Sequence, residues 1–285
     1  MKKIISKLTV FALLIASTVL TACDKKNHDV PVPKTQQMAV GSVRVYDFGK
    51  IKLHAYETKD ALADESFILE TDDELVMIEL AGFKKNIAEI QNYVKGLNKP
   101  LNNVVVAYHP AGGDIYPAAT IYAMDGLGEA GLVAGFVQAF GDSFNGSLPT
   151  KYEQVKPGKM TIGGIKMNII KTADAFDIEI PAINVYLTHM VGHNTHNILG
   201  SMESIDEMMN LMKKMKAKNY GLILSGHDTP RTIEITTEKI NYLTKIKELA
   251  KTNTNAKDFI DAVNKEFPNY MGGNYLEMSA AGLYK

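Results

Sequence analysis

Residues 104–114 read VVVAYHPAGGD, a short apolar run that leads directly into a histidine and a glycine-rich loop. A run of this length with almost no polar residue is typical of a strand buried on both faces of a sheet. Residues 222–227, which read LILSGH, repeat the arrangement later in the chain. Both segments therefore predict buried strands that lead into a histidine, His109 in the first case and His227 in the second.

The segments around these two strands alternate between strand-like and helix-like patterns. Strand patterns, several of them joined by turn residues, cover residues 43–48, 51–56, 66–70, 74–80 and 103–107, and then 160–162, 165–170, 175–180, 184–188 and 222–225. Apolar residues at helical spacing cover residues 84–97, 205–215 and 236–250. Two halves that each supply strands and helices predict an α/β fold, an αββα sandwich of two mixed sheets flanked by helices.

The N-terminus predicts export and lipid attachment. Lys2, Lys3 and Lys7 precede a short apolar segment that ends in residues 20–23, LTAC, which resembles a bacterial lipobox. The apolar segment is too short to span a bilayer, and Cys23 is the only cysteine of the chain, so lipid modification explains it better than a disulfide. We expect a signal peptide over residues 1–22, the lipidated Cys23 and a flexible tether over 23–40, and one domain over 41–285. The expected location is the bacterial cell envelope, on the periplasmic or surface side, with the lipid anchor as the only membrane contact.

Composition narrows the partners of the domain. The net charge is −1, with 31 basic and 32 acidic residues interspersed along the chain, so nothing favours binding to nucleic acid. No later segment is long and apolar enough to cross a membrane. A small-molecule substrate or ligand is the partner that remains.

Histidines gather at the ends of the predicted strands. Five of the seven follow this rule: His109, His189, His193, His196 and His227. Loops at strand ends are where layered sheets usually build their sites. The pattern therefore predicts that several imidazoles meet at one rim of the sandwich.

The order of these elements resembles the metallo-β-lactamase superfamily over nearly the whole mature chain. Residues 76–82, VMIELAG, stand where the family has an apolar strand followed by Asp-Thr-Gly, with Glu79 in place of the acid. Residues 104–114 stand where the family has His-x-His-x-Asp-His after a buried strand, and residues 222–227 match its later strand ending in Gly-His. The resemblance implies the family's sandwich fold and a metal-dependent hydrolase.

The sequence departs from the family at the metal ligands. If His109 is aligned with the second histidine of the motif, Ala107, Ala111 and Gly112 replace the other ligands. If His109 is aligned with the first histidine, Ala111 and Gly113 stand at ligand positions without a ligand side chain, and Asp114 falls at the last ligand position. Neither register rebuilds the two-metal set, so the resemblance favours one ion over two.

A reduced set of ligands remains for that single ion. Imidazoles and a carboxylate suit zinc, which is the expected cofactor. The candidate metal ligands are His109, Asp174, His189, His196 and His227. Asp114 and Asp228 are the candidate catalytic proton acceptors.

Two functions compete on these residues. The first is a metal-dependent hydrolase that acts on an ester, lactone, amide or phosphoester. The alternative is a non-catalytic pseudoenzyme that kept a small-molecule pocket and lost its metals. The substrate and the oligomeric state stay open.

Overall fold

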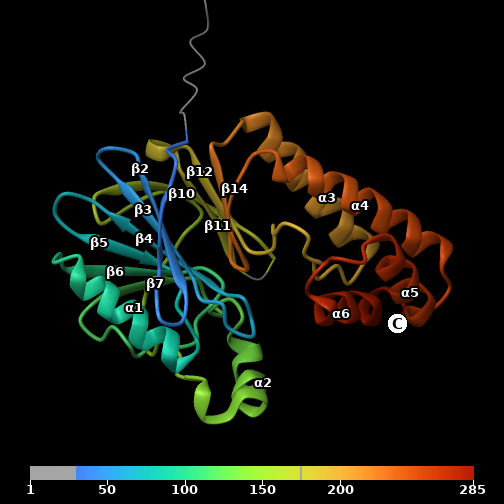
Figure 1. Ribbon diagram of the computed structural model, residues 1–285, viewed down its shortest axis with the longest axis horizontal. Coiled ribbons are helices and arrows are strands. Elements are labelled where there is room, and N and C mark those ends of the chain that lie inside the picture. The colour runs from blue at the N-terminus through green and yellow to red at the C-terminus, as the bar shows by residue number, and fades with distance from the viewer. Residues whose placement is uncertain (1–29, 174) are drawn as a thin grey trace, which may run out of the picture.

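The computed structural model describes residues 30–173 and 175–285 and arranges them as two β-sheets stacked face to face, with helices on the outside (Figure 1). The first sheet contains, in chain order across the sheet, β1 (Lys34–Gln37), β2 (Ser42–Asp47), β3 (Lys52–Glu57), β4 (Glu65–Glu70), β5 (Leu75–Ile78), β6 (Leu101–Val106), β7 (Thr120–Ala123) and β8 (Glu153–Gln154). Strands β1 to β5 pair antiparallel, and β5 to β8 pair parallel. The sheet is therefore mixed, as expected.

The second sheet has six strands in the order β14-β13-β12-β11-β10-β9. These are β9 (Gly158–Ile162), β10 (Ile165–Lys171), β11 (Phe176–Ile180), β12 (Val185–Thr188), β13 (Leu222–Ser225) and β14 (Asp228–Thr232). Only β12 and β13 run parallel, and Thr188 pairs with Ser225 at their ends. The residues that follow these two strands consequently emerge side by side.

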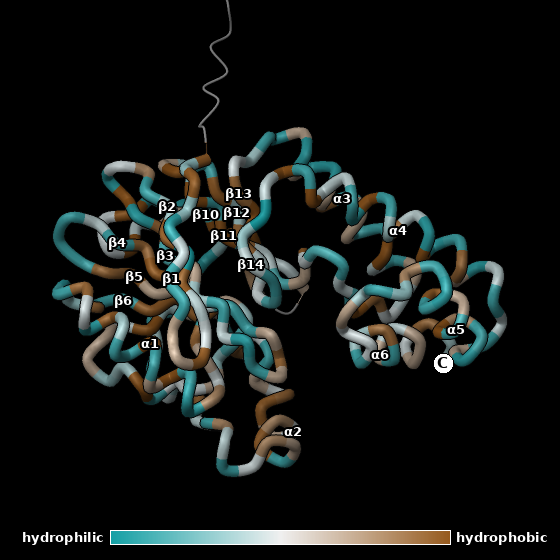
Figure 2. Tube along the Cα trace, in the orientation of Figure 1, coloured by the Kyte–Doolittle hydropathy of each residue, from teal (hydrophilic) through white to brown (hydrophobic). Residues whose placement is uncertain are grey.

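The main core lies between the two sheets. Leu53, Leu69 and Val105 of the first sheet pack with Ile178 and Leu187 of the second, and all five are almost fully buried. Figure 2 shows the hydrophobic segments running along the strands of both sheets. Burial of these side chains is the main force that holds the sheets together.

Helices cover the outer face of each sheet. Helix α1 (Lys84–Gly96) packs Ile90 and Val94 on the first sheet, as its apolar spacing predicts. The outer side of the second sheet carries α3 (Met202–Lys218), α4 (Ile235–Thr252), α5 (Ala256–Glu266) and α6 (Gly273–Leu283). Ser201 and Ser204 form a reciprocal capping box at the start of α3. The αββα sandwich predicted from the sequence is thus confirmed.

Several elements were not predicted. Strand β1 pairs with β2 although it lies within the stretch expected to be a tether, so ordered structure begins before residue 41. Helix α2 (Ala130–Phe140) protrudes from one end of the molecule, next to the short helix η1 (Gly141–Ser143) (Figure 1). A second short helix, η2 (Pro181–Ile183), joins β11 to β12. Within the described residues, no helix is both long and apolar enough to cross a membrane.

Candidate metal centre

Three histidines meet at one rim of the sandwich. His109 follows β6 in the first sheet, while His189 and His227 follow the parallel strands β12 and β13 in the second. Their Nε2 atoms lie 3.2 Å apart between His109 and His189, 3.3 Å between His109 and His227, and 2.9 Å between His189 and His227. The convergence predicted for these three histidines is therefore present in the structure.

This geometry fits a bound metal ion. Zinc–nitrogen bonds of about 2.0–2.1 Å in a tetrahedral site place neighbouring nitrogen ligands about 3.3 Å apart. Three mutually close imidazole nitrogens cannot all satisfy one another by hydrogen bonds, because in at least one pair two protons or two lone pairs must face each other. A central cation satisfies all three lone pairs. Within residues 30–173 and 175–285, this is the one group of three or more His, Cys, Asp or Glu side chains close enough together to hold an ion.

Burial keeps two of the rings neutral, which is the form that binds metal. It lowers the pKa of His109 to about 4 and the pKa of His189 well below its ordinary value. At His227 burial also disfavours the charged ring, but the hydrogen bond and negative charge of Asp64 outweigh it and raise the pKa. The three rings are thus distinguished by their surroundings.

The loop between β3 and β4 orients His227. Nδ1 of His227 lies 3.0 Å from the carbonyl oxygen of Leu62 and 3.3 Å from Oδ1 of the buried Asp64. A proton held on Nδ1 by these acceptors leaves the lone pair of Nε2 directed at the other two histidines. Sequence reasoning missed Asp64, because a lone acid in a loop carries no periodic signal.

Glu79 fixes the backbone that carries His109. Its carboxylate accepts hydrogen bonds from the backbone N–H groups of Ala107 (3.1 Å), Tyr108 (2.9 Å) and His109 (2.6 Å). Burial raises the pKa of Glu79 to about 7 despite these donors. Nδ1 of His109 is buried without a hydrogen-bond partner, with Glu79 Oε2 3.9 Å away. Glu79 thus holds the backbone of the loop that carries His109.

A buried network supports His189. The ring of Tyr108 stacks on His189 with centroids 4.5 Å apart and an interplanar angle of 7°. The hydroxyl of Tyr108 donates to Asp177 Oδ1 at 2.6 Å, and the hydroxyl of Tyr186 donates to Asp177 Oδ2 at 2.7 Å. Burial raises the pKa of Asp177. The hydrogen bonds that the two tyrosines donate act in the opposite direction and lower it. The network links the first sheet to the second directly beneath the histidines.

Glu129 is an acid beside the histidine cluster that lines the adjoining cavity. It sits at the start of α2, and its Oε1 lies 3.4 Å from Nε2 of His189. Its backbone N–H donates to the carbonyl oxygen of Tyr108, which ties the start of α2 to the His109 loop. Glu129 was not predicted from the sequence, because a single acid in the loop before α2 carries no periodic signal.

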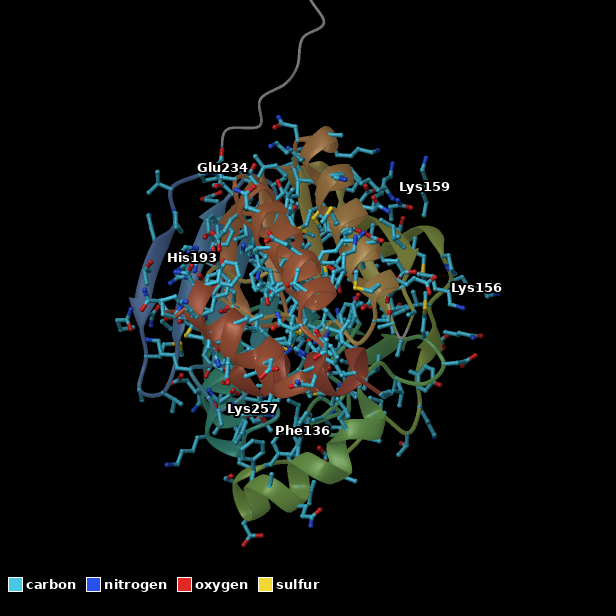
Figure 3. All side chains as sticks on the ribbon, turned by 90° about the vertical axis from the view of Figure 1, so that its right-hand side faces the viewer. Phe136, Lys156, Lys159, His193, Glu234 and Lys257 are labelled. Atoms are coloured by element: carbon cyan, nitrogen blue, oxygen red, sulfur yellow. The ribbon has the colours of Figure 1, made fainter. Side chains whose placement is uncertain are left out.

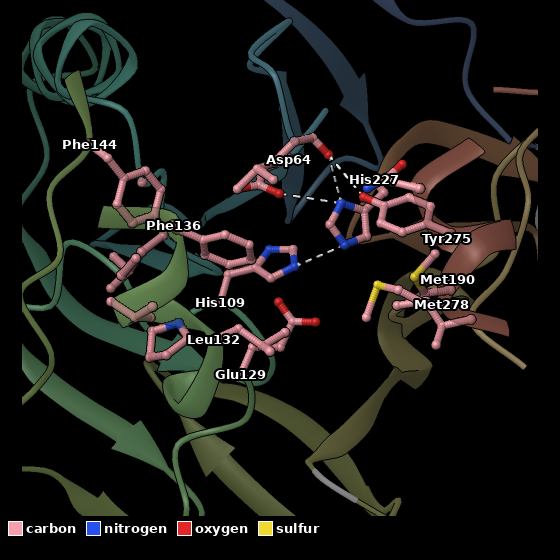
Figure 4. Close-up of a pocket in the computed structure, with 18 residues that line it drawn as sticks. Asp64, His109, Glu129, Leu132, Phe136, Phe144, Met190, His227, Tyr275 and Met278 are labelled. Carbon is pink, nitrogen blue, oxygen red and sulfur yellow. Dashed lines mark hydrogen bonds and ion pairs between the residues drawn. The ribbon is translucent and has the colours of Figure 1, made fainter. Parts of the chain in front are cut away.

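The histidines open into a cavity with largely apolar walls (Figure 4). His109, His227, Asp64 and Glu129 provide polar groups on one side. The apolar wall includes Leu132, Val133, Phe136, Phe144, Met190 and Met278. The histidine cluster therefore lies at the polar side of this cavity.

His196 does not join the cluster. Its Nδ1 is paired with the hydroxyl of Tyr242 on α4 at 3.0 Å, and the ring is buried there. Burial and then the charge of Lys239 lower the pKa of His196 to about 4. His193, three residues earlier, lies at the surface beside Glu238 (Figure 3). The loop that carries these two histidines packs against α4, and both side chains contact that helix.

The other predicted site residues lie elsewhere. Asp114 accepts hydrogen bonds from Asn145 and Ser147 in an exposed loop, and these two bonds lower its pKa. Asp228 forms an ion pair with Arg231 at 2.8 Å and accepts from the backbone of His193. Neither acid lines the cavity that opens from the histidines. Asp174 and Cys23 lie outside the described residues.

Comparisons with known proteins rest on structure alone. No family model matches the chain, and no curated protein matches its sequence. The fold, however, is similar to several solved structures. A double mutant of the sec-alkylsulfatase PisA1 superposes with a TM-score of 0.59 at 13% identity, and the stereoselective inverting sec-alkylsulfatase Pisa1 from Pseudomonas sp. with a TM-score of 0.56 at 13% identity. Both alignments cover 81% of this chain and 48% of the other, so the chain spans about half the length of these sulfatase structures.

A metallo-β-lactamase from Pontibacter korlensis is similar at a TM-score of 0.50 and 11% identity, with 74% of this chain and 99% of that chain covered. The chain therefore has the metallo-β-lactamase fold, which confirms the resemblance seen in its sequence. Identities this low define the fold and leave the activity to be argued from the site.

Proposed function

We propose that this protein is a metal-dependent hydrolase with a single zinc ion held by His109, His189 and His227. The observation that carries the proposal is the convergence of the three Nε2 atoms within 3.3 Å of one another at the floor of a cavity. Three protein ligands with one position left for water or substrate are typical of catalytic zinc sites. A zinc ion at this point would polarise a carbonyl or phosphoryl oxygen and lower the pKa of a coordinated water.

The surrounding residues supply orientation and a proton acceptor. Asp64 holds the tautomer of His227, while Tyr108 and Glu79 hold His189 and the His109 loop. Glu129 lies beside the cluster on its cavity side, with Oε1 3.4 Å from Nε2 of His189. At this position Oε1 would accept a proton from the attacking water. The bond that breaks belongs to an ester, lactone, amide or phosphoester.

Hydrolysis of a panel of such substrates by protein reconstituted with zinc tests the proposal. We expect turnover that a chelator removes and that His189→Ala abolishes. Turnover that survives both treatments would separate these residues from the reaction. Zinc binding without turnover of any panel member would instead favour the alternative, a binding protein that retains the pocket.

We also propose that the protein is a lipid-anchored envelope protein. Support comes from the basic N-terminus and from residues 20–23, LTAC. Growth of an expressing bacterium with an alkyne-labelled fatty acid tests this: the wild-type chain should carry the label and Cys23→Ala should not. Label retained by the variant would contradict the proposal.

A further inference from the structure

Two cavities meet at the histidine cluster. The first touches His109 and His227 and runs along α2, while the second touches His189 and runs along β10 and α3. Glu129, Leu132, Met190, Ile198 and Met278 line both. The metal ligands therefore lie where the two spaces join.

Beyond the histidines the first cavity is largely apolar, with Asn274 and Tyr275 as further polar side chains in its lining. Among the described residues that line it there is no lysine or arginine, and the acids Asp64 and Glu129 lie at the histidines. Its far wall comes from α2, which has no charged residue between Ala130 and Phe140 and is mostly hydrophobic (Figure 2). Phe136 and Phe144 close this end with rings 5.7 Å apart. Such a wall offers no partner for a charged or strongly polar group.

The second cavity has a different character. Lys171, Lys214 and Glu207 line it together with the hydroxyl-bearing Thr172 and Ser204. The buried hydrogen-bonded group of Tyr108, Tyr186 and Asp177 forms its floor. Both signs of charge and several hydroxyls are available there to hydrogen-bond a polar ligand.

We propose that the substrate is amphipathic: an uncharged alkyl or aryl part occupies the α2 cavity, and a polar part occupies the cavity between β10 and α3. The inference rests on the proposed function in placing the bond to be cleaved at the histidines, between the two parts. The apolar part contributes binding by burial, up to about fourfold in affinity for each added methylene. Because the aromatic wall closes the α2 cavity, this gain ends at a limiting chain length.

Binding to metal-free protein tests this inference separately from hydrolysis. Chelator-treated protein carrying ¹³C-methyl methionine would be titrated with methyl ketones from 2-butanone to 2-decanone and followed by NMR. Met190 and Met278 line the cavities, whereas Met271 is 65% exposed and lines neither. We expect the methyl signals of Met190 and Met278 to shift and that of Met271 to stay, with affinity rising several-fold per methylene up to the limiting length.

Two substitutions on α2 form a matched pair. Leu132 and Val137 are 41% and 42% exposed, but only Leu132 lines the cavities. Leu132→Gln should weaken binding of 2-octanone at least fivefold and Val137→Gln should leave it unchanged. Affinity independent of chain length, or equal loss in both variants, would overturn the inference. Hydrolysis can fail while ketone binding persists, so the failure of the proposed function remains distinguishable.

Discussion

Oδ1 of Asp64 lies 3.3 Å from Nδ1 of His227, although the two residues are 163 positions apart in the sequence and lie in loops next to different sheets. The contact places a carboxylate behind a histidine whose other nitrogen faces His109 and His189. Outer partners of this kind fix the tautomer and raise the basicity of a metal-binding histidine. The proposed metal site therefore includes a supporting carboxylate in addition to its three candidate ligands.

Asp64→Asn should weaken zinc binding by about 10- to 100-fold, because the neutral amide no longer stabilises the proton on Nδ1 of His227. Competition with a chromogenic chelator measures the affinity. Asp114→Asn is the control, since the carboxylate of Asp114 bonds Asn145 and Ser147 in a separate loop. Equal affinity in Asp64→Asn and wild type would remove Asp64 from the site.

Glu129→Gln should retain zinc and lose turnover by about 10²- to 10⁴-fold, the contribution typical of a general base. The amide keeps the shape of the side chain and cannot accept the proton. Parallel measurement of bound zinc and kcat distinguishes the roles. Loss of the metal in this variant would show that Glu129 acts as a ligand instead.

Tyr186→Phe should lower the free energy of unfolding by about 1–3 kcal/mol, because the buried carboxyl group of Asp177 loses one of its donors. Urea denaturation of the metal-free protein measures the change. Tyr116→Phe is the matched control: the hydroxyl of Tyr116 is also buried but has no hydrogen-bond partner among the described residues. A loss of the same size in both variants would show that the contact with Asp177 contributes nothing specific.

The convergence of His109, His189 and His227 could be predicted from sequence because each follows a short buried strand, and strand ends of stacked sheets meet at a common rim. Asp64 and Glu129 could not, because they lie in irregular loops whose path depends on tertiary packing. Tertiary packing also explains why His196, predicted as a metal ligand, lies outside the cluster. The loop that carries it turns inward, and the ring packs against Tyr242 and Tyr270.

Stability should depend on pH through His196. Its folded pKa of about 4 lies below the ordinary value of 6.5, so the unfolded chain binds more protons between these pH values. The stability that the neutral ring of His196 contributes is complete above pH 6.5. It is lost as the pH falls toward 4, which lowers the free energy of unfolding by up to about 3 kcal/mol. His196→Gln should flatten this part of the pH profile of unfolding. Parallel profiles for wild type and His196→Gln would contradict the assignment.

The central claim is that His109, His189 and His227 jointly hold one metal ion. Elemental analysis of protein purified without chelator tests it most directly, with His189→Ala, His227→Ala and the outlying His196→Gln measured beside wild type. We predict about one zinc ion per chain in wild type and His196→Gln and almost none in the other two variants. Metal-free wild type, or undiminished zinc in His189→Ala and His227→Ala, would contradict it.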